Sequence, residues 1–122
     1  MNILVTGGAG FIGRYLAEQI LNNNQITIYD DLSNSSIEKI SFLIKKGVKF
    51  VRGDVLDFEK LLENSKNFDV VIHLAAKSDV AESVIFPEDT INVNVNGTIN
   101  VLKCCAQNKI QKIIFASSAA VY

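Results

Sequence analysis

Five short apolar runs alternate with segments of helical periodicity along this 122-residue chain. The runs lie at Asn2–Val5, Gln25–Tyr29, Lys49–Arg52, Val70–Leu74 and Lys112–Ala116. Short, nearly continuous apolar strands are typical of parallel sheets, in which helices cover both faces. The alternation therefore predicts an α/β fold of one domain over residues 1–122, with about five strands in a doubly wound parallel sheet and right-handed crossovers.

Four segments are expected to be helical. The first contains Ile12, Leu16 and Ile20, which repeat every four residues and so share one face. The others are Ser35–Lys46, which Gly47 would end; Asp57–Asn64, with Asp57 as the N-cap; and the longest, from after Pro87 to near Asn108.

The longest helix contains two apolar stripes on roughly opposite sides. One is Ile91, Val95, Ile99, Leu102 and Ala106; the other is Val93, Gly97, Val101 and Cys104. Only one of them can face the sheet, and an exposed apolar stripe usually finds a partner. We therefore expect a homodimer with two-fold symmetry, built on the helix at residues 88–108.

Composition excludes several functions. The net charge of −1 leaves no basic footprint for nucleic acid and no polybasic patch for a membrane. The adjacent cysteines Cys104 and Cys105 indicate no disulfide framework, and are expected to be small packed residues of a cytoplasmic protein. His73 is the only histidine, so no metal site is expected, and packing with hydrogen bonding is its expected role.

Glycine recurs at positions 7, 8, 10 and 13, directly after the first predicted strand and at the start of the first helix. Ligands of parallel sheets bind beyond the carboxyl ends of the strands. Free N–H groups at a helix N-terminus favour a phosphate there. A glycine-rich turn with no ligand is the alternative, because glycine motifs alone are weak signals.

Two carboxylates strengthen the dinucleotide interpretation. Asp30 ends the second predicted strand about 20 residues after the glycines, where dinucleotide folds place the acid that binds a ribose diol. Its charge would repel a ribose 2′-phosphate, so NAD is favoured over NADP. Asp54 ends the third strand and could accept a hydrogen bond from an adenine amino group. Each aspartate alone would be read as a cap or turn residue.

The blocks TGGAGFIG, DDLSNS, GDV, HLAA, NVNGT and SSAAVY follow one another along the chain. In this order they resemble the extended short-chain dehydrogenase/reductase family, the NAD-dependent nucleotide-sugar epimerases and dehydratases. The run from His73 to Thr98 is most similar to the UDP-glucose 4-epimerase branch. The resemblance covers the whole chain and implies a Rossmann-type fold.

The resemblance also implies residue roles at the cofactor. The pyrophosphate would be lined by Gly7, Gly10, Phe11, Ile12 and Gly13. The adenosine would be held by Asp30 at its ribose, flanked by Asn34 and Ser35, with Asp54 and Val55 beside the adenine. The nicotinamide ribose would lie over Leu74, Ala75, Ala76 and Ser78. Epimerases of that branch carry a lysine at the position of Ser78, whereas here the lysine is Lys77.

Three further residues take family roles by the same resemblance. Asn94 would tie the long helix to the loop after the fourth strand, although a solvated helix residue is the alternative. Ser118 resembles the catalytic serine that hydrogen-bonds the sugar hydroxyl, and Ser117 would support it. A helix cap is the alternative for this serine pair.

The family's catalytic tyrosine, paired with a lysine four residues later, would lie beyond Tyr122. The chain is therefore expected to be the cofactor portion of a longer architecture, without the Tyr/Lys helix and the substrate domain, and inactive alone. Its expected function is the NAD-binding part of a nucleotide-sugar epimerase or dehydratase. A non-catalytic dinucleotide-binding fragment and an NAD-dependent reductase of the same family are the alternatives; a downstream Tyr-x-x-x-Lys and a substrate domain would favour the epimerase.

Overall fold

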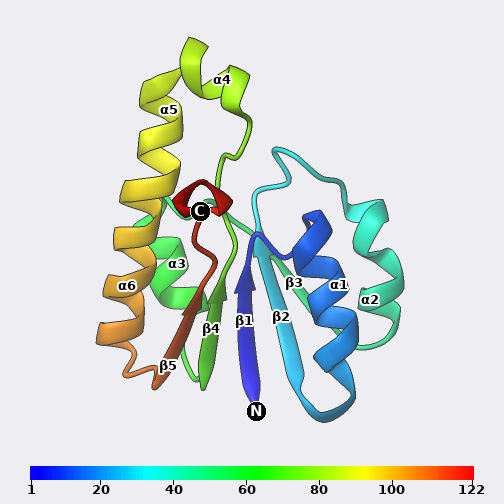
Figure 1. Ribbon diagram of the computed structural model, residues 1–122. Helices are drawn as coiled ribbons and strands as arrows, with labels where there is room; N and C mark the ends of the chain where they lie inside the picture. The colour runs from blue at the N-terminus through cyan, green and yellow to red at the C-terminus, as the bar shows by residue number, and fades with distance from the viewer.

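The computed structural model describes all residues from Met1 to Tyr122, and its centre is a five-stranded parallel sheet (Figure 1). The strands are β1 (Asn2–Thr6), β2 (Gln25–Asp30), β3 (Lys49–Arg52), β4 (Val70–His73) and β5 (Lys112–Phe115). Their order across the sheet is β3-β2-β1-β4-β5, and every neighbouring pair is parallel. The predicted α/β fold is confirmed, and the five strands match the five apolar runs to within one residue at each end.

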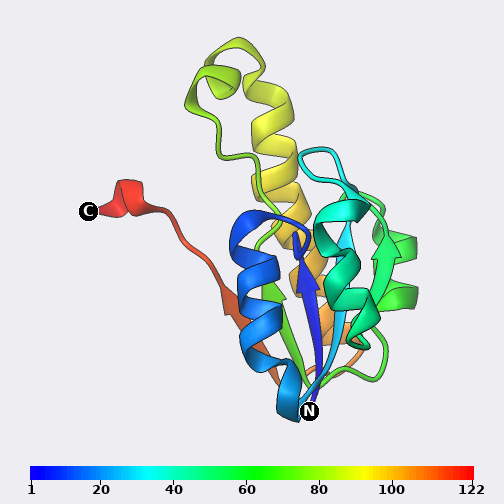
Figure 2. The same cartoon turned by 90° about the vertical axis from the view of Figure 1, so that its right-hand side faces the viewer.

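Helices cover both faces of this sheet. One face carries α1 (Phe11–Ile20), which runs into a 3₁₀ turn at Leu21–Asn23, and α2 (Ser41–Lys45); the other carries α3 (Phe58–Asn64) and α6 (Gly97–Gln107) (Figures 1 and 2). Side chains alternate along each strand, so Ile3 and Val5 join the core under α1, whereas Leu4 joins the core under α6. The sheet is therefore the shared wall of two separate cores.

The second predicted helix is shorter than its sequence pattern suggests. A 3₁₀ turn at Ile37–Ile40 precedes α2, and Ile40 and Leu43 are the residues fully buried against the sheet. The other two isoleucines of this segment, Ile37 and Ile44, are each 39% exposed. The 3₁₀ turn has three residues per turn instead of 3.6, so side chains before and after it do not stay on one helical face. Gly47 ends the helix at φ 100°, as expected of a C-cap glycine.

The longest helix consists of α5 (Pro87–Ile91), a π-helical turn at Asn92–Asn96, and α6, while a short helix α4 (Val80–Ile85) precedes it. Val101 and Cys104 of the second stripe are buried against the sheet, and both cysteines are free thiols packed in that core. The first stripe faces outward: Ile91, Val95, Ile99 and Leu102 are between 43% and 57% exposed. The expectation that one stripe would face solvent in a monomer is therefore confirmed.

The edge strand β5 departs from the prediction of strands buried on both faces. Ile113 packs into the α6 core, but Ile114 and Phe115 are 49% and 56% exposed. No helix of the structure covers this strand on the α1 side, and its outer edge has no paired strand. Beyond β5 the chain leaves the sheet and ends in a 3₁₀ turn at Ala119–Val121, away from the body of the molecule (Figure 2). None of the helices combines the length and hydropathy needed to cross a bilayer.

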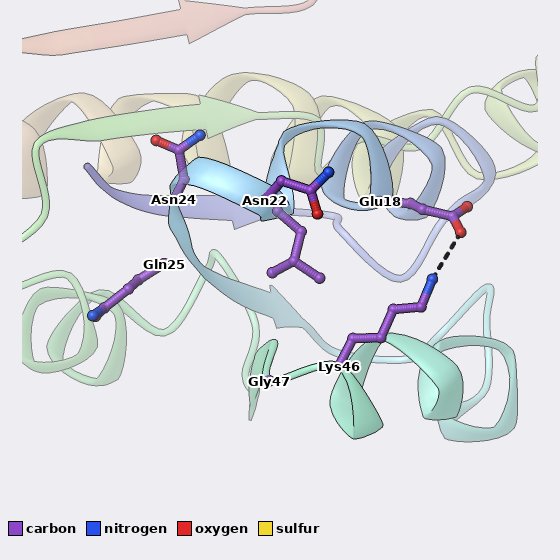
Figure 3. A pocket seen from close by; sticks show the side chains of 7 residues that line it. Glu18, Asn22, Asn24, Gln25, Lys46 and Gly47 are labelled. Atoms are coloured by element: carbon purple, nitrogen blue, oxygen red, sulfur yellow. Dashed lines mark hydrogen bonds and ion pairs between the residues drawn. The ribbon is translucent and has the colours of Figure 1, made fainter.

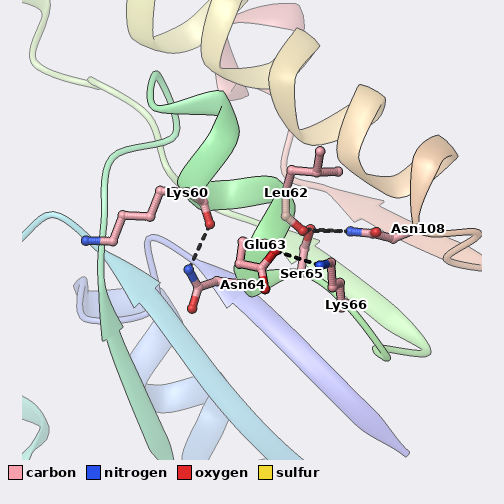
Figure 4. A network of polar contacts seen from close by, with 7 residues as sticks. All are labelled: Lys60, Leu62, Glu63, Asn64, Ser65, Lys66 and Asn108. Carbon is pink, nitrogen blue, oxygen red and sulfur yellow. Dashed lines mark hydrogen bonds and ion pairs between the residues drawn. The ribbon is translucent and has the colours of Figure 1, made fainter.

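A polar network joins the C-terminal ends of α3 and α6 (Figure 4). The Asn108 side-chain amide donates to the carbonyl oxygen of Leu62 at 3.0 Å and to the Ser65 hydroxyl at 2.8 Å. Ser65 is buried and donates its own hydroxyl to the same Leu62 carbonyl at 3.2 Å, so without Asn108 the Ser65 oxygen would lose its donor. Asn64, in the same network, bonds only within its own helix, to the Lys60 carbonyl.

We predict that Asn108→Ala lowers the free energy of unfolding by about 1–3 kcal/mol, because it leaves the buried Ser65 oxygen without its donor and removes one of the two donors to the Leu62 carbonyl. Asn64→Ala is the matched control and should cost under about 1 kcal/mol, since its one bond is local and solvent can replace it. Urea unfolding of both variants measures the difference. Equal losses would show that the link between α3 and α6 carries no extra stability.

Candidate functional site

A cleft of about 470 Å³ opens at the carboxyl ends of the strands. Fourteen of the residues predicted to bind cofactor line it: Gly7, Gly10, Phe11, Ile12, Gly13, Asp30, Asn34, Ser35, Asp54, Val55, Leu74, Ala75, Ala76 and Ser78. They come from the ends of β1, β2, β3 and β4, which the parallel topology brings to one edge of the sheet. The structure therefore brings segments 70 residues apart into one concave surface.

The glycine loop, residues 7–13, requires glycine at two of its positions. Gly7 has φ 68°, and a Cβ there would lie 2.6 Å from the Ala75 nitrogen, so only glycine permits this approach to the β4 loop. A Cβ on Gly13 would lie 2.5 Å from the Gly8 Cα and 2.8 Å from the Gly7 carbonyl oxygen. The missing side chain at Gly13 lets the first turn of α1 pack directly on the loop.

The N-terminus of α1 points its free donors into this cleft. Gly10 is the N-cap and has no side chain to satisfy them, and no protein acceptor binds the N–H groups of Phe11, Ile12 and Gly13. A Cβ on Gly10 would meet only the Gly7 carbonyl oxygen, at 3.3 Å, so its outer side is open. Free N–H groups, the positive end of a ten-residue helix and open space together suit a phosphate group.

Asp30 connects β2 to the glycine loop. One of its carboxylate oxygens accepts the Ala9 N–H at 3.0 Å and the other accepts the Leu32 N–H at 2.8 Å. Ser35 adds a second link, donating its hydroxyl to the Ala9 carbonyl at 2.6 Å. Burial raises the pKa of Asp30, although its two backbone N–H bonds lower it. Each oxygen keeps a lone pair, so the carboxylate can still accept from a diol.

The wall formed after β3 rests on Tyr29. The Tyr29 hydroxyl donates to the Asp54 carbonyl at 3.2 Å, and burial raises its pKa to about 12, which keeps the phenol protonated as a donor. Gly53 lies directly on the Tyr29 ring, where a Cβ would overlap the ring atoms. The Asn100 side chain, from α6, donates to the Val55 carbonyl at 2.9 Å. Asp54 and Val55 are thus held at the cleft through their carbonyl oxygens, by the side chains of Tyr29 on β2 and Asn100 on α6.

The wall formed after β4 is held by Asn94. Its side-chain carbonyl accepts the Lys77 N–H at 2.7 Å and its amide donates to the Lys77 carbonyl at 2.9 Å. This pair of bonds ties the long helix to the strand-four loop, the arrangement expected for Asn94, and excludes a merely solvated side chain. The Lys77 ammonium group forms an ion pair of 2.9 Å with the Glu82 carboxylate. Asn94 itself does not line the cleft, although its neighbour Val93 does. Its side chain holds the wall through the backbone of Lys77.

Ser117 and Ser118 also lie outside the cleft lining, whereas Ala116 belongs to it. The Ser118 hydroxyl oxygen accepts the Ala120 N–H at 3.1 Å, so it caps the terminal 3₁₀ turn, which was the alternative interpretation of this serine pair. The segment that carries both serines projects away from the sheet (Figure 2). Their catalytic and supporting roles stay predictions.

Eight lining residues were not predicted from the sequence: Tyr29, Asp31, Ser33, Gly53, Lys77, Glu82, Val93 and Ala116. Most are chain neighbours of predicted residues, and Gly53 stood beside Asp54 in a quoted block. Lys77 was noted only as the lysine that stands one position before the family's, and Glu82 carried no signal, because its pairing with Lys77 depends on how the loop between β4 and α4 folds back. No group of three or more His, Cys, Asp or Glu in the structure could hold a metal ion.

A second hollow, of about 530 Å³, lies at the opposite end of the sheet (Figure 3). Its lining is polar except for Leu21, and an ion pair of 3.2 Å between Lys46 and Glu18 crosses its rim. Gly47 and Asn24 complete its edge, near the amino ends of the strands. It has neither the glycine loop nor a free helix N-terminus, so the cleft at the carboxyl ends is the candidate site.

Comparison with known proteins defines the class to which this fold and cleft belong. The chain belongs to the NAD dependent epimerase/dehydratase family, whose model matches residues 3–122. A pea bifunctional UDP-glucose 4-epimerase and UDP-xylose 4-epimerase is 40% identical over 131 residues, which cover 98% of this chain and 37% of the pea protein. UDP-glucose 4-epimerase of Yersinia enterocolitica is 38% identical and covers 100% of this chain and 38% of its own length.

Solved structures give the same result. UDP-glucose 4-epimerase from Brucella ovis, in complex with NAD, superposes with a TM-score of 0.89 at 37% identity, over 99% of this chain and 37% of that one. The Stenotrophomonas maltophila enzyme, with bound NAD and formylated UDP-arabinopyranose, gives a TM-score of 0.92 at 32% identity, over 100% of this chain and 38% of that one. The chain thus spans 37% to 38% of the length of these four relatives.

We predict that Gly13→Ala lowers the free energy of unfolding by about 1–3 kcal/mol, because its Cβ would overlap the backbone of Gly7 and Gly8. Gly10→Ala is the matched control: φ is −70° there, and the new methyl group meets only one carbonyl oxygen. It should cost less than about 1 kcal/mol. Chemical unfolding at pH 7 compares them, and equal costs would mean that the loop adapts to a side chain at Gly13.

Proposed function

We propose that this chain is the NAD-binding portion of a nucleotide-sugar epimerase or dehydratase that acts on a UDP-sugar. The main support is the direct bond between the glycine loop and the acid of β2, the Ala9 N–H to the Asp30 carboxylate at 3.0 Å. That bond keeps the free N–H groups at the start of α1 and the Asp30 carboxylate in one cleft, which supports the binding of a phosphate and a ribose there. The relatives named above, epimerases of UDP-sugars, support the substrate class.

In this proposal the cofactor is held along the cleft. The N–H groups at the start of α1 donate to the pyrophosphate, with Phe11 and Ile12 beside it. Asp30 accepts from the adenosine ribose, with Asn34 and Ser35 at its side. Asp54 and Val55 flank the adenine. The wall of Leu74, Ala75, Ala76 and Ser78 supports the nicotinamide ribose, and Asn94 positions that wall.

NAD⁺, when bound, supplies a hydride acceptor that takes hydride from a sugar carbon and returns it, so that it is not consumed. The chain's own part is to bind and orient. Ser118, whose hydroxyl oxygen accepts the Ala120 N–H, keeps its proton free to donate to a sugar hydroxyl. The two free thiols, buried in the α6 core, are consistent with a cytoplasmic protein.

The outward stripe of the long helix supports a second part of the proposal, a homodimer with two-fold symmetry. Ile91, Val95, Ile99 and Leu102 follow one another along the free side of this helix. A two-fold axis would place each stripe against its copy, which would remove apolar surface from water on both chains.

We predict that the parent chain binds NAD⁺ more tightly than NADP⁺, because Asp30 would repel a 2′-phosphate. Asp30→Ala should weaken NAD⁺ binding about tenfold to hundredfold, the loss of hydrogen bonds to a charged acceptor, and narrow the difference between the two cofactors. Asp89→Ala is the control, since it removes the same charge from α5, outside the cleft lining, and should leave both affinities unchanged. Isothermal titration calorimetry measures all three proteins. Equal or tighter NADP⁺ binding by the parent chain would contradict the role of Asp30.

We also predict that light scattering at micromolar concentration reports two chains per particle. Ile99→Glu should give monomers, because it buries a charge at the centre of the stripe without touching the core. Gln107→Glu adds the same charge at an exposed position of the same helix and should leave the dimer intact. A monomeric parent chain would refute the dimer while leaving the cofactor proposal untouched.

A further inference from the structure

His73 is buried beneath the cleft, and no role in binding or catalysis has been given to it. Its side chain is 2% exposed at the end of β4. Nδ1 lies 2.6 Å from the Thr6 hydroxyl oxygen on β1, and Nε2 lies 2.9 Å from the Thr98 hydroxyl oxygen on α6. The ring therefore bridges two strands and the long helix, and its two nitrogens have one partner each.

The groups at the two ends of this chain of contacts determine where every proton lies. At one end the Ala75 N–H, which can only donate, points to the Thr6 hydroxyl oxygen at 3.4 Å. At the other end the Thr98 hydroxyl donates to the Asn94 carbonyl at 2.6 Å. Because the Thr98 proton is used there, the Thr98 oxygen must accept from Nε2–H of His73. Nδ1 is then unprotonated and accepts from the Thr6 hydroxyl.

We propose that Thr6, His73 and Thr98 form a one-way hydrogen-bond relay that holds the Leu74–Ser78 wall of the cleft against the long helix. In this relay His73, neutral and protonated at Nε2, is a positioning residue. The wall is the part of the cleft assigned to the nicotinamide ribose, so the value of this arrangement for the cofactor rests on the proposed function. The relay itself does not.

Both ends of the relay reach that wall. Ala75 belongs to the cleft lining and donates into the relay directly. The main-chain carbonyl of Asn94 accepts the last hydrogen bond of the relay, from the Thr98 hydroxyl. The Asn94 side chain binds both backbone groups of Lys77. Asn94 lies in the π-helical turn, a distortion of the kind often found in helices at functional sites. The wall is thus held at Ala75 and at Lys77 by one continuous set of bonds.

The relay requires a neutral ring. A proton on Nδ1 would turn it into a donor, and the Thr6 hydroxyl would lose its acceptor. The side chains packed on the ring, Thr6, Thr98 and the stacked Phe115 at 5.9 Å, carry no charge. Burial lowers the pKa of His73 to about 4, which keeps the ring neutral at physiological pH. Since the unfolded chain protonates near its ordinary value, this group lowers stability as pH falls from 6.5 towards 4.

The ring tautomer tests the relay in the parent chain. His73 is the only histidine, so ¹⁵N-histidine labelling gives one pair of ring nitrogen signals. At pH 7 and without cofactor, we expect Nε2 in the protonated range of shifts and Nδ1 in the unprotonated range. The opposite tautomer, or signals averaged between the two, would overturn the one-way relay.

Amide hydrogen exchange tests what the relay holds. Thr98→Val removes the hydroxyl but keeps the shape, and should speed exchange at Ala75 and Lys77 about fivefold to tenfold, the effect of about one lost hydrogen bond. Thr98→Ser should restore the parent rates. Ile28, in a strand outside the relay, should exchange at the same rate in all three proteins.

If Thr98→Val speeds amide exchange at Ile28 as much as at Ala75, the variant is destabilised as a whole. If the exchange rates at Ala75 and Lys77 do not change, the wall does not depend on the relay. Either result contradicts the proposal. If Thr98→Val does not fold, the tautomer of the parent chain still decides. Neither measurement uses NAD, so the relay can fail while the proposed function stands, and the reverse.

Discussion

The close approach of Gly7 to the backbone of Leu74 and Ala75 is the contact on which the cleft depends. A Cβ on Gly7 would lie 2.6 Å from the Ala75 nitrogen, so any other residue would force the ends of β1 and β4 apart. Their register, Thr6 beside His73, continues directly into this contact. With the two strand ends in contact, the glycine loop and the β4 loop form neighbouring walls of one cleft. The same register brings the Thr6 hydroxyl within 2.6 Å of His73.

Opposite charges are arranged along that cleft. The start of α1 offers unpaired N–H groups, and Asp30 and Asp54 line the side towards β2 and β3. The Asp30 carboxylate already accepts two backbone N–H bonds, so it orders the loop and still presents lone pairs to the cleft. A dinucleotide carries negative phosphates at its centre and donor hydroxyls on its riboses, and this distribution complements it.

The exposed apolar surface is as informative as the two cores. The core under α1 and α2 and the core under α3 and α6 are closed by the chain's own side chains. By contrast, Ile99 of α6 and Phe115 of β5 are 43% and 56% exposed. The first belongs to the stripe proposed to meet a second copy. The second lies on the edge strand β5, whose outer side has no paired strand.

Sequence alone determined the parallel α/β fold, the five strands and most of the cleft. Strand patterns, helix periodicity and the glycine loop are local properties, and parallel topology brings every strand end to one edge. The family resemblance, and no local pattern, predicted Asn94 as the tie between helix and loop. The patterns overextended the second helix, where a 3₁₀ turn precedes Ser41, and overestimated the burial of β5.

Only the tertiary structure decided which helix stripe faces the sheet, because the more apolar stripe, which contains Ile99, is the one that faces outward. The other stripe packs inward through small residues, and a Cβ on Gly97 would lie 2.7 Å from the Val55 side chain. The tertiary structure also decided the pairing of Lys77 with Glu82 and the partners of His73, since Thr6, His73 and Thr98 meet only after two strands and a helix have packed. Periodicity reports what each segment buries. The partner of a buried polar group depends on residues distant in the chain, and is therefore set by packing.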